Sequence, residues 1–98
     1  MRIEFTRSGG FAGMRLNVVL DTKDIPEAEA LELKRMVEAA DFFNLPESMP
    51  LPGADAFHYK ITIQSDNETH TVEADERAVP PALMPLVTRL VGAARSSR

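Results

Sequence analysis

Hydrophobic and polar residues alternate in the first twenty positions, on both sides of a glycine-rich interruption. Apolar side chains recur at every second position from Met1, and a similar alternation returns over residues 14–20. Because successive side chains of a strand point to opposite faces, this pattern predicts strands over residues 1–7 and 14–20. The interruption at residues 8–13 then joins them as a β-hairpin.

The connector of this hairpin carries three glycines and one aromatic residue. Gly9, Gly10 and Gly13 allow positive φ angles, which other residues rarely adopt. Phe11 is a large apolar side chain at the tip, where burial in the protein's own core is hard to arrange. Two interpretations stay open. Phe11 folds back over the sheet edge or a helix end, or it projects into a pocket of another protein.

Two later segments have the spacing of helices that pack against a core. The first covers residues 26–40, with Asp24 as its expected N-cap. The second covers residues 82–94, where Pro85 should delay the regular helix or kink it. Their apolar stripes are Ala30, Leu33, Met36, Val37 and Ala40 in the first helix, and Leu83, Leu86, Val87, Leu90, Val91 and Ala94 in the second.

A second pair of strands is predicted over residues 57–64 and 69–74, around a turn centred on Asp66 and Asn67. This register places the apolar positions of both strands on one face of the sheet. Its pairs are Ile63 with His70, Ile61 with Val72, and Tyr59 with Ala74.

The order of these elements predicts an α+β fold. It is ββαββα, a four-stranded, mainly antiparallel sheet with two helices packed on one face. A chain of 98 residues has room for one domain, which covers residues 1–98. The side chains expected to be buried are Leu16, Val18, Leu33, Val37, Ile61, Val72, Leu86 and Leu90.

Residues 41–56 form a long connector that contains several prolines. Proline lacks an amide proton and fixes φ, so the segment is predicted to be neither a helix nor a central strand. A proline-stiffened loop loses little entropy on docking, which makes it a second candidate contact segment; the alternative is a plain spacer. Asp41 and Asp55 could meet a basic group or a partner's metal ion, although nothing in their spacing singles them out. The residues expected to tie its start to the core are Phe42, Phe43 and Leu45.

Composition narrows the classes of function. The formal net charge is −4 and the pI about 5.1, which argues against a nucleic-acid binder, since such proteins need a basic face. The chain has no cysteine, which excludes disulfides and thiolate metal sites and favours a reducing compartment. We expect a soluble, cytoplasmic protein with no membrane partner, because neither a signal peptide nor a membrane-length apolar run is visible.

Candidate catalytic and metal-binding groups form no recognisable constellation. A zinc site needs three or four ligands, whereas His58 and His70 are the two histidines and fall on opposite faces of the predicted sheet. Ser8 lies among glycines but not in a G-x-S-x-G elbow, and no motif places partners for it. We therefore expect no enzymatic activity, no metal and no cofactor.

Short segments in a fixed order run through most of the chain. They are Arg2-Ile3-Glu4-Phe5, Arg7-Ser8-Gly9-Gly10-Phe11-Ala12-Gly13, Arg15-Leu16, Ala39-Ala40-Asp41-Phe42-Phe43-Asn44-Leu45-Pro46, Pro52-Gly53-Ala54-Asp55, Phe57, Tyr59, His70-Thr71-Val72, Leu83 and Pro85-Leu86. In this order they resemble the emfourin family, bacterial protein inhibitors of thermolysin-like (M4) metallopeptidases that are associated with protealysin-like enzymes. The opening block is the specific part of the resemblance, and the later pieces count through their order.

The resemblance implies a non-covalent inhibitor that blocks the active-site cleft of an M4 metallopeptidase with exposed loops. We expect the free chain to be a monomer. Thermolysin-like enzymes favour a bulky apolar residue just after the scissile bond, and we infer that Phe11 enters the pocket for it. The alternative is a small intracellular interaction or regulatory module with a non-protease partner. The residues expected to contact the partner are Ser8, Gly9, Gly10, Phe11, Ala12, Gly13, Pro50, Pro52 and Asp55.

Overall fold

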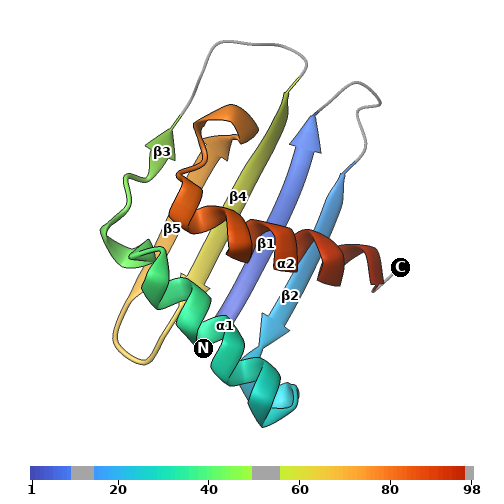
Figure 1. Ribbon diagram of the computed structural model, residues 1–98, viewed down its shortest axis with the longest axis vertical. Helices are drawn as coiled ribbons and strands as arrows, with labels where there is room; N and C mark the ends of the chain where they lie inside the picture. The colour runs from blue at the N-terminus through green and yellow to red at the C-terminus, as the bar shows by residue number, and fades with distance from the viewer. Residues whose placement is uncertain (10–14, 50–55, 97–98) are drawn as a thin grey trace.

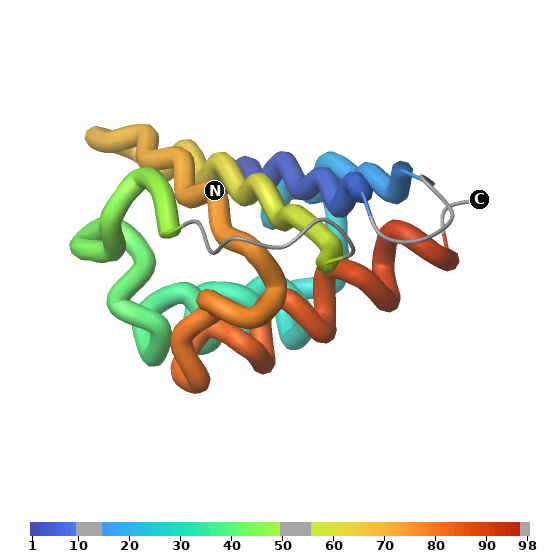
Figure 2. Tube along the Cα trace, turned by 90° about the horizontal axis from the view of Figure 1, so that it is seen from above, coloured from blue at the N-terminus to red at the C-terminus, as the bar shows by residue number. Residues whose placement is uncertain are grey.

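The computed structural model describes residues 1–9, 15–49 and 56–96, and over these residues the chain forms one five-stranded sheet with two α-helices. Figure 1 shows both helices crossing the same face of the sheet, and the view in Figure 2 separates the two layers. The strands are β1 Arg2–Gly9, β2 Leu16–Asp21, β3 Ser48–Met49, β4 Phe57–Gln64 and β5 Thr69–Asp75, and the helices are α1 Glu27–Ala39 and α2 Met84–Ser96. The α+β class and the two helices are as predicted.

The sheet has the strand order β2-β1-β4-β5-β3. The two predicted hairpins, β1–β2 and β4–β5, meet through an antiparallel pairing of β1 with β4. The predicted register of the second hairpin is confirmed, and its turn is closed by a hydrogen bond of 2.9 Å from Ser65 N to Glu68 O. The pairing of β1 with β4 fixes which strand ends lie side by side.

The prediction of four strands was wrong, because the proline-containing connector supplies a fifth. β3 pairs in parallel with β5, and Glu73 N donates to Glu47 O at 2.8 Å. A strand of two residues is too short to show a period, and Pro46 and Pro50 on either side hide it further. The strand lies at the edge of the sheet, which is where prolines nearby are tolerated.

The core fills the space between the sheet and the two helices. Seven of the eight side chains expected there are buried, and Val18 is half-buried because β2 is an edge strand with one neighbour. Phe42 is buried, and Phe43 and Leu45 pack against the core, so the start of the 41–56 connector is tied down as predicted. The fully buried large side chains are Ile3, Phe5, Leu33, Phe42, Ile61, Ile63, Val72, Leu83, Leu86, Val87 and Leu90.

The start of α1 differs from the prediction. Asp24 is not its N-cap, since it lies in the 3-10 turn η1 (Thr22–Asp24), and Pro26 holds the N-cap position. Asp21 caps η1 instead, accepting from Lys23 N at 3.0 Å. Pro85 is the second residue of α2, in the first helical turn, where a missing amide proton removes no intrahelical bond.

Candidate partner-binding edge

Both candidate contact segments leave the sheet at the same end. β1 ends at Gly9 and β4 begins at Phe57, and these two residues face each other in the register. We call this the loop end of the sheet, defined by Ser8, Gly9, Ala56 and Phe57; in Figure 1 it is the upper end. Residues 10–14 follow Gly9 and residues 50–55 precede Ala56. The seven predicted contact residues that lie outside the described part of the chain are Gly10, Phe11, Ala12, Gly13, Pro50, Pro52 and Asp55.

Gly9 is a position where the backbone requires glycine. Its φ is +80°, and a Cβ placed there would lie 3.2 Å from the carbonyl oxygen of Ala56. Both features oppose any larger residue, because positive φ strains other residues and the approach to backbone leaves little room. Gly9 thus lets β1 run close beside Ala56 at the loop end. Ser8, the other predicted contact residue within the described part of the chain, is half-buried opposite His58.

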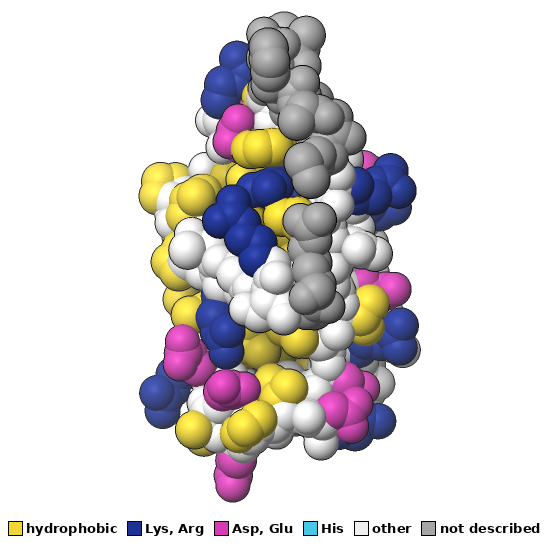
Figure 3. Space-filling view, turned by 90° about the vertical axis from the view of Figure 1, so that its right-hand side faces the viewer, with side chains coloured by type: hydrophobic (Ala, Val, Ile, Leu, Met, Phe, Trp, Pro, Cys, Tyr) yellow, Lys and Arg dark blue, Asp and Glu magenta, His cyan; other side chains and the backbone are white. Residues whose placement is uncertain are grey.

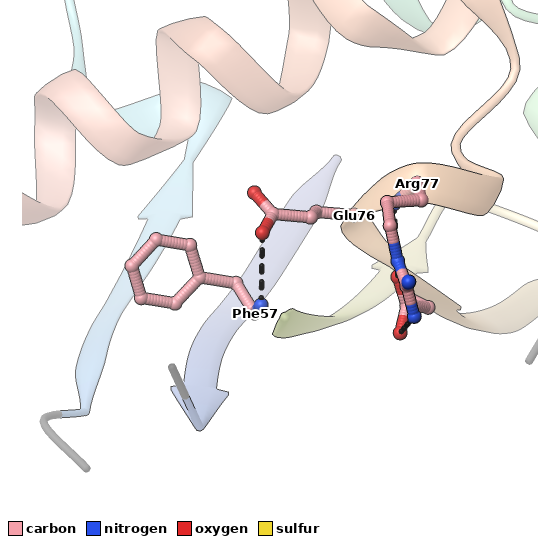
Figure 4. Close-up of polar contacts among 4 residues, drawn as sticks. Phe57, Glu76 and Arg77 are labelled. Carbon is pink, nitrogen blue, oxygen red and sulfur yellow. Dashed lines mark hydrogen bonds and ion pairs between the residues drawn. The ribbon is translucent and has the colours of Figure 1, made fainter. Parts of the chain in front are cut away.

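The first residue of β4 is held by a side chain that the sequence did not single out. Glu76 lies in η3 (Glu76–Ala78), the 3-10 turn after β5, and its Oε1 accepts a hydrogen bond of 3.1 Å from Phe57 N (Figure 4). No periodicity or motif marks Glu76, because its role depends on β4 and β5 being neighbours. The bond anchors the chain where it returns from residues 50–55.

The η3 turn is itself fixed by a buried aspartate. Asp75 Oδ1 accepts from Arg77 N at 2.9 Å and from Arg77 Nε at 3.1 Å, while Oδ2 lies 3.3 Å from Arg77 Nη2. The side-chain hydrogen bond from Arg77, followed by the backbone one, lowers the pKa of the Asp75 carboxyl from its ordinary value of 3.8. The ionised carboxylate therefore stabilises the turn that presents Glu76.

One cation and three aromatic rings lie on the sheet next to the loop end. The guanidinium carbon of Arg7 lies 4.1 Å from the centre of the Phe57 ring, a cation–π geometry. Tyr59 is buried and its ring packs against Phe5 at a centroid distance of 5.9 Å. Burial raises the pKa of the Tyr59 phenol above 10.0, the charge of Glu76 raises it further, and Arg7 opposes both effects.

The two histidines serve different structural roles. His70 Nε2 donates to Leu45 O at 2.7 Å, and its ring contacts those of Phe42 and Phe43. His58 is exposed on the other face, with Nε2 3.2 Å from Glu73 Oε1. Among the described residues, no three histidine or acidic side chains gather as a metal site would require.

Comparison with known families places this edge in context. The family model of Emfourin matches residues 5–91, which include β1 from Phe5 to Gly9, and Phe57 and Tyr59 on β4. The chain belongs to the Emfourin family. Neither the curated proteins nor the solved structures gave a match for it.

Membership of the Emfourin family implies the role of a protease inhibitor, and therefore a protein partner. An inhibitor family accords with the expectation of a chain that is not an enzyme. Neither α1 nor α2 is long and apolar enough to cross a membrane, and the same holds for every helix in the described ranges. The cytoplasmic location stays a prediction.

Proposed function

We propose that the chain is a non-covalent inhibitor of a thermolysin-like (M4) zinc metallopeptidase, of the protealysin type, and that the loop end of the sheet enters the enzyme's active-site cleft. The observation that carries the proposal is the pairing of Gly9 with Phe57. Because of this pairing, the two segments selected from the sequence join the sheet at neighbouring points of the same end. A pair of adjacent loops on rigid strands is a suitable shape for filling a cleft.

The anchoring contacts support this use of the loop end. Loops lose conformational entropy when they dock, and fixed ends reduce that loss. Gly9 is fixed by the β1–β4 pairing, and Phe57 by the hydrogen bond from its amide to Glu76. Phe11, between the two strands of the first hairpin, has the chemistry for a pocket that receives a bulky apolar residue. The proposal requires no cofactor and no covalent step by the inhibitor.

The test is a titration of a thermolysin-like peptidase with the purified chain, following hydrolysis of a peptide substrate. We expect activity to fall to completion near one equivalent, to return on dilution, and to leave no covalent adduct by mass spectrometry. A zinc peptidase of another family and a serine peptidase serve as controls that should keep full activity. Full activity of the thermolysin-like enzyme at a large excess of the chain would contradict the proposal and favour a module for a non-protease partner.

A matched pair of variants locates the contact on the molecule. Gly9→Ala introduces a strained φ and a close approach to Ala56 at the loop end, so it should weaken inhibition. Asp66→Ala changes an exposed residue of the turn at the other end of the sheet and should inhibit like the unmodified chain. Equal inhibition by both variants would place the contact elsewhere.

A further inference from the structure

Arg7 carries a charge that the described part of the chain leaves without a counter-ion. It lies on β1 opposite the buried residues Tyr59 and Leu16, so its side chain faces the helix layer. Its Nε is buried, and among residues 1–9, 15–49 and 56–96 it has neither a hydrogen-bond partner nor a carboxylate within ion-pair distance. A guanidinium cannot shed its proton in a protein, so the charge persists. A buried donor without a partner requires an explanation.

The side chain opens into a groove along helix α2. The groove has a volume of about 370 Å³. Val87 and Val91 supply apolar lining, and Arg95 from the last turn of α2 adds a second cation. The lining residues, all within the described ranges, include two arginines and no carboxylate. Figure 3 shows Lys and Arg side chains beside apolar ones on a flank of the molecule.

We propose that Arg7, together with Arg95, binds an aspartate or glutamate side chain of the protein partner, while the apolar lining of the groove receives the residues next to it. The identity of the partner rests on the proposed function, and the groove belongs to the same edge because Arg7 lies two residues before Gly9. A carboxylate fits the fork of a guanidinium through two parallel charge-assisted hydrogen bonds.

Arg7 is prepared for this contact before the partner arrives. The Phe57 ring holds the guanidinium in place, so little side-chain entropy remains to be lost on binding. Its Nε has already lost its water, so the usual desolvation cost of a buried ion pair is partly met in the free protein. The nearby Glu76 hydrogen-bonds Phe57 N rather than Arg7.

The net charge of the chain predicts which rate of binding the loss of Arg7 should change. Because the chain carries −4 overall, its long-range field does not attract an acidic partner. A local pair between Arg7 and a carboxylate acts once the two surfaces touch. Loss of Arg7 should therefore raise the dissociation rate and leave the association rate nearly unchanged.

The first test uses the free protein and no peptidase. The NMR signal of Arg7 Nε–Hε is followed during a titration with sodium acetate, and again with sodium chloride at the same ionic strength. We expect acetate to move this signal more than chloride does, and to leave that of the exposed Arg35 on α1 unaffected. Equal responses of Arg7 to the two salts would overturn the carboxylate site, whatever the chain inhibits.

The second test uses the peptidase with Arg7→Met, which keeps the stem and removes the charge. We expect inhibition to weaken by about 30-fold or more, mainly through faster dissociation, with the melting temperature unchanged or raised. Arg7→Lys should restore part of the loss, because it keeps the charge without the fork. Arg35→Met is the matched control and should inhibit normally.

The outcomes separate the two proposals. If Arg7→Met inhibits as strongly as the unmodified chain, Arg7 does not bind a carboxylate of the partner. This holds even if acetate shifts the NMR signal of Arg7 Nε–Hε. Arg7→Met could also lower the melting temperature while its affinity, corrected for the folded fraction, stays normal. That result would show that Arg7 only stabilises the position of Phe57, and it would also overturn the proposal. If the unmodified chain inhibits no M4 peptidase, the proposed function fails, and the acetate titration still decides whether Arg7 binds a carboxylate.

Discussion

The two ends of the sheet are built in different ways. At one end, which we call the closed end, β4 and β5 join through a short turn bonded from Ser65 N to Glu68 O, and Thr22 N donates to Met1 O at 2.9 Å. At the loop end, connectors at residues 10–14 and 50–55 meet the sheet at Gly9 and Ala56. Short backbone-bonded connections favour stability, while long connectors offer surface for contact. We propose that the closed end serves stability and the loop end serves recognition, and the predictions below test that division.

The largest effect should come from the core that supports both ends. Leu33 on α1 and Leu90 on α2 are fully buried. Replacing either with alanine should lower the free energy of unfolding by about 2–5 kcal/mol, through lost burial and a cavity. Urea unfolding measures the change, and inhibition should fall only as the folded fraction falls. An unchanged melting temperature in both variants would contradict this account of the core.

The next largest effect should come from Phe11, which separates recognition from stability. Phe11→Ala should weaken binding to a thermolysin-like peptidase by about 2 kcal/mol or more, because aromatic anchors contribute strongly to interfaces. Its melting temperature should stay close to that of the unmodified chain. If Phe11 instead packs into the core, the same change should cost roughly 3 kcal/mol of stability or more. If Phe11→Ala changes neither inhibition nor stability, Phe11 is not the anchor, and residues 46–56 become the candidate contact segment.

A matched pair of hydrogen bonds compares the two ends directly. His70 bonds Leu45 O near the closed end, and Glu76 bonds Phe57 N at the loop end. His70→Phe keeps a ring but removes the donor, and should lower stability by about 0.5–1.5 kcal/mol with normal inhibition. Glu76→Ala should instead weaken inhibition with a smaller change in melting temperature.

Glu76→Gln is the control for this pair, since its side-chain oxygen can still accept from Phe57 N. It should recover most of the inhibition that Glu76→Ala loses. The division between the ends would not hold if His70→Phe weakened inhibition while Glu76→Ala acted only on stability.

The smallest effect is a pH dependence at each end. Hydrogen bonds lower the pKa of Asp75 at the loop end and of Asp21 at the closed end below 3.8, Asp75 through the Arg77 side chain and Asp21 through Lys23 N. A lowered folded-state pKa stabilises the protein fully above 3.8, and the contribution is lost as the pH falls below 3.8. Thermal melts between pH 5 and about pH 2.5 should therefore show a shallower decline for Asp75→Asn and for Asp21→Asn. Asp75→Asn should also shift the NMR signal of the Phe57 amide, whereas Asp21→Asn should not. A shift with Asp21→Asn and none with Asp75→Asn would contradict the link from Asp75 to Glu76.

Much of the fold follows from local pattern, and the site does not. Alternation located β1, β2, β4 and β5 because each is long enough to show a period of two, and matching apolar positions set the β4–β5 register. The pairing of β1 with β4 joins residues that lie 48 to 62 positions apart, and no local signal specifies it. The position of Gly9 beside Phe57 and that of Arg7 beside the Phe57 ring depend on that pairing, whereas the bond from Phe57 N to Glu76 depends on the pairing of β4 with β5 and on the η3 turn that follows. The sequence could thus suggest two candidate contact segments without showing that both join the sheet at the same end.

The short parallel strand β3 has a consequence for the length of the connector that follows it. β3 and β4 both pair with β5, from opposite sides, so Met49 and Phe57 are tethered about two strand spacings apart, or roughly 10 Å. The intervening residues 50–56 could reach more than about 20 Å when extended. The tether therefore uses less than half of the available reach. We therefore expect that a residue can be removed from or added to this connector without pulling β3 or β4 out of the sheet. If the connector contacts the partner as proposed, its length and composition are free to change with the partner while the scaffold stays the same.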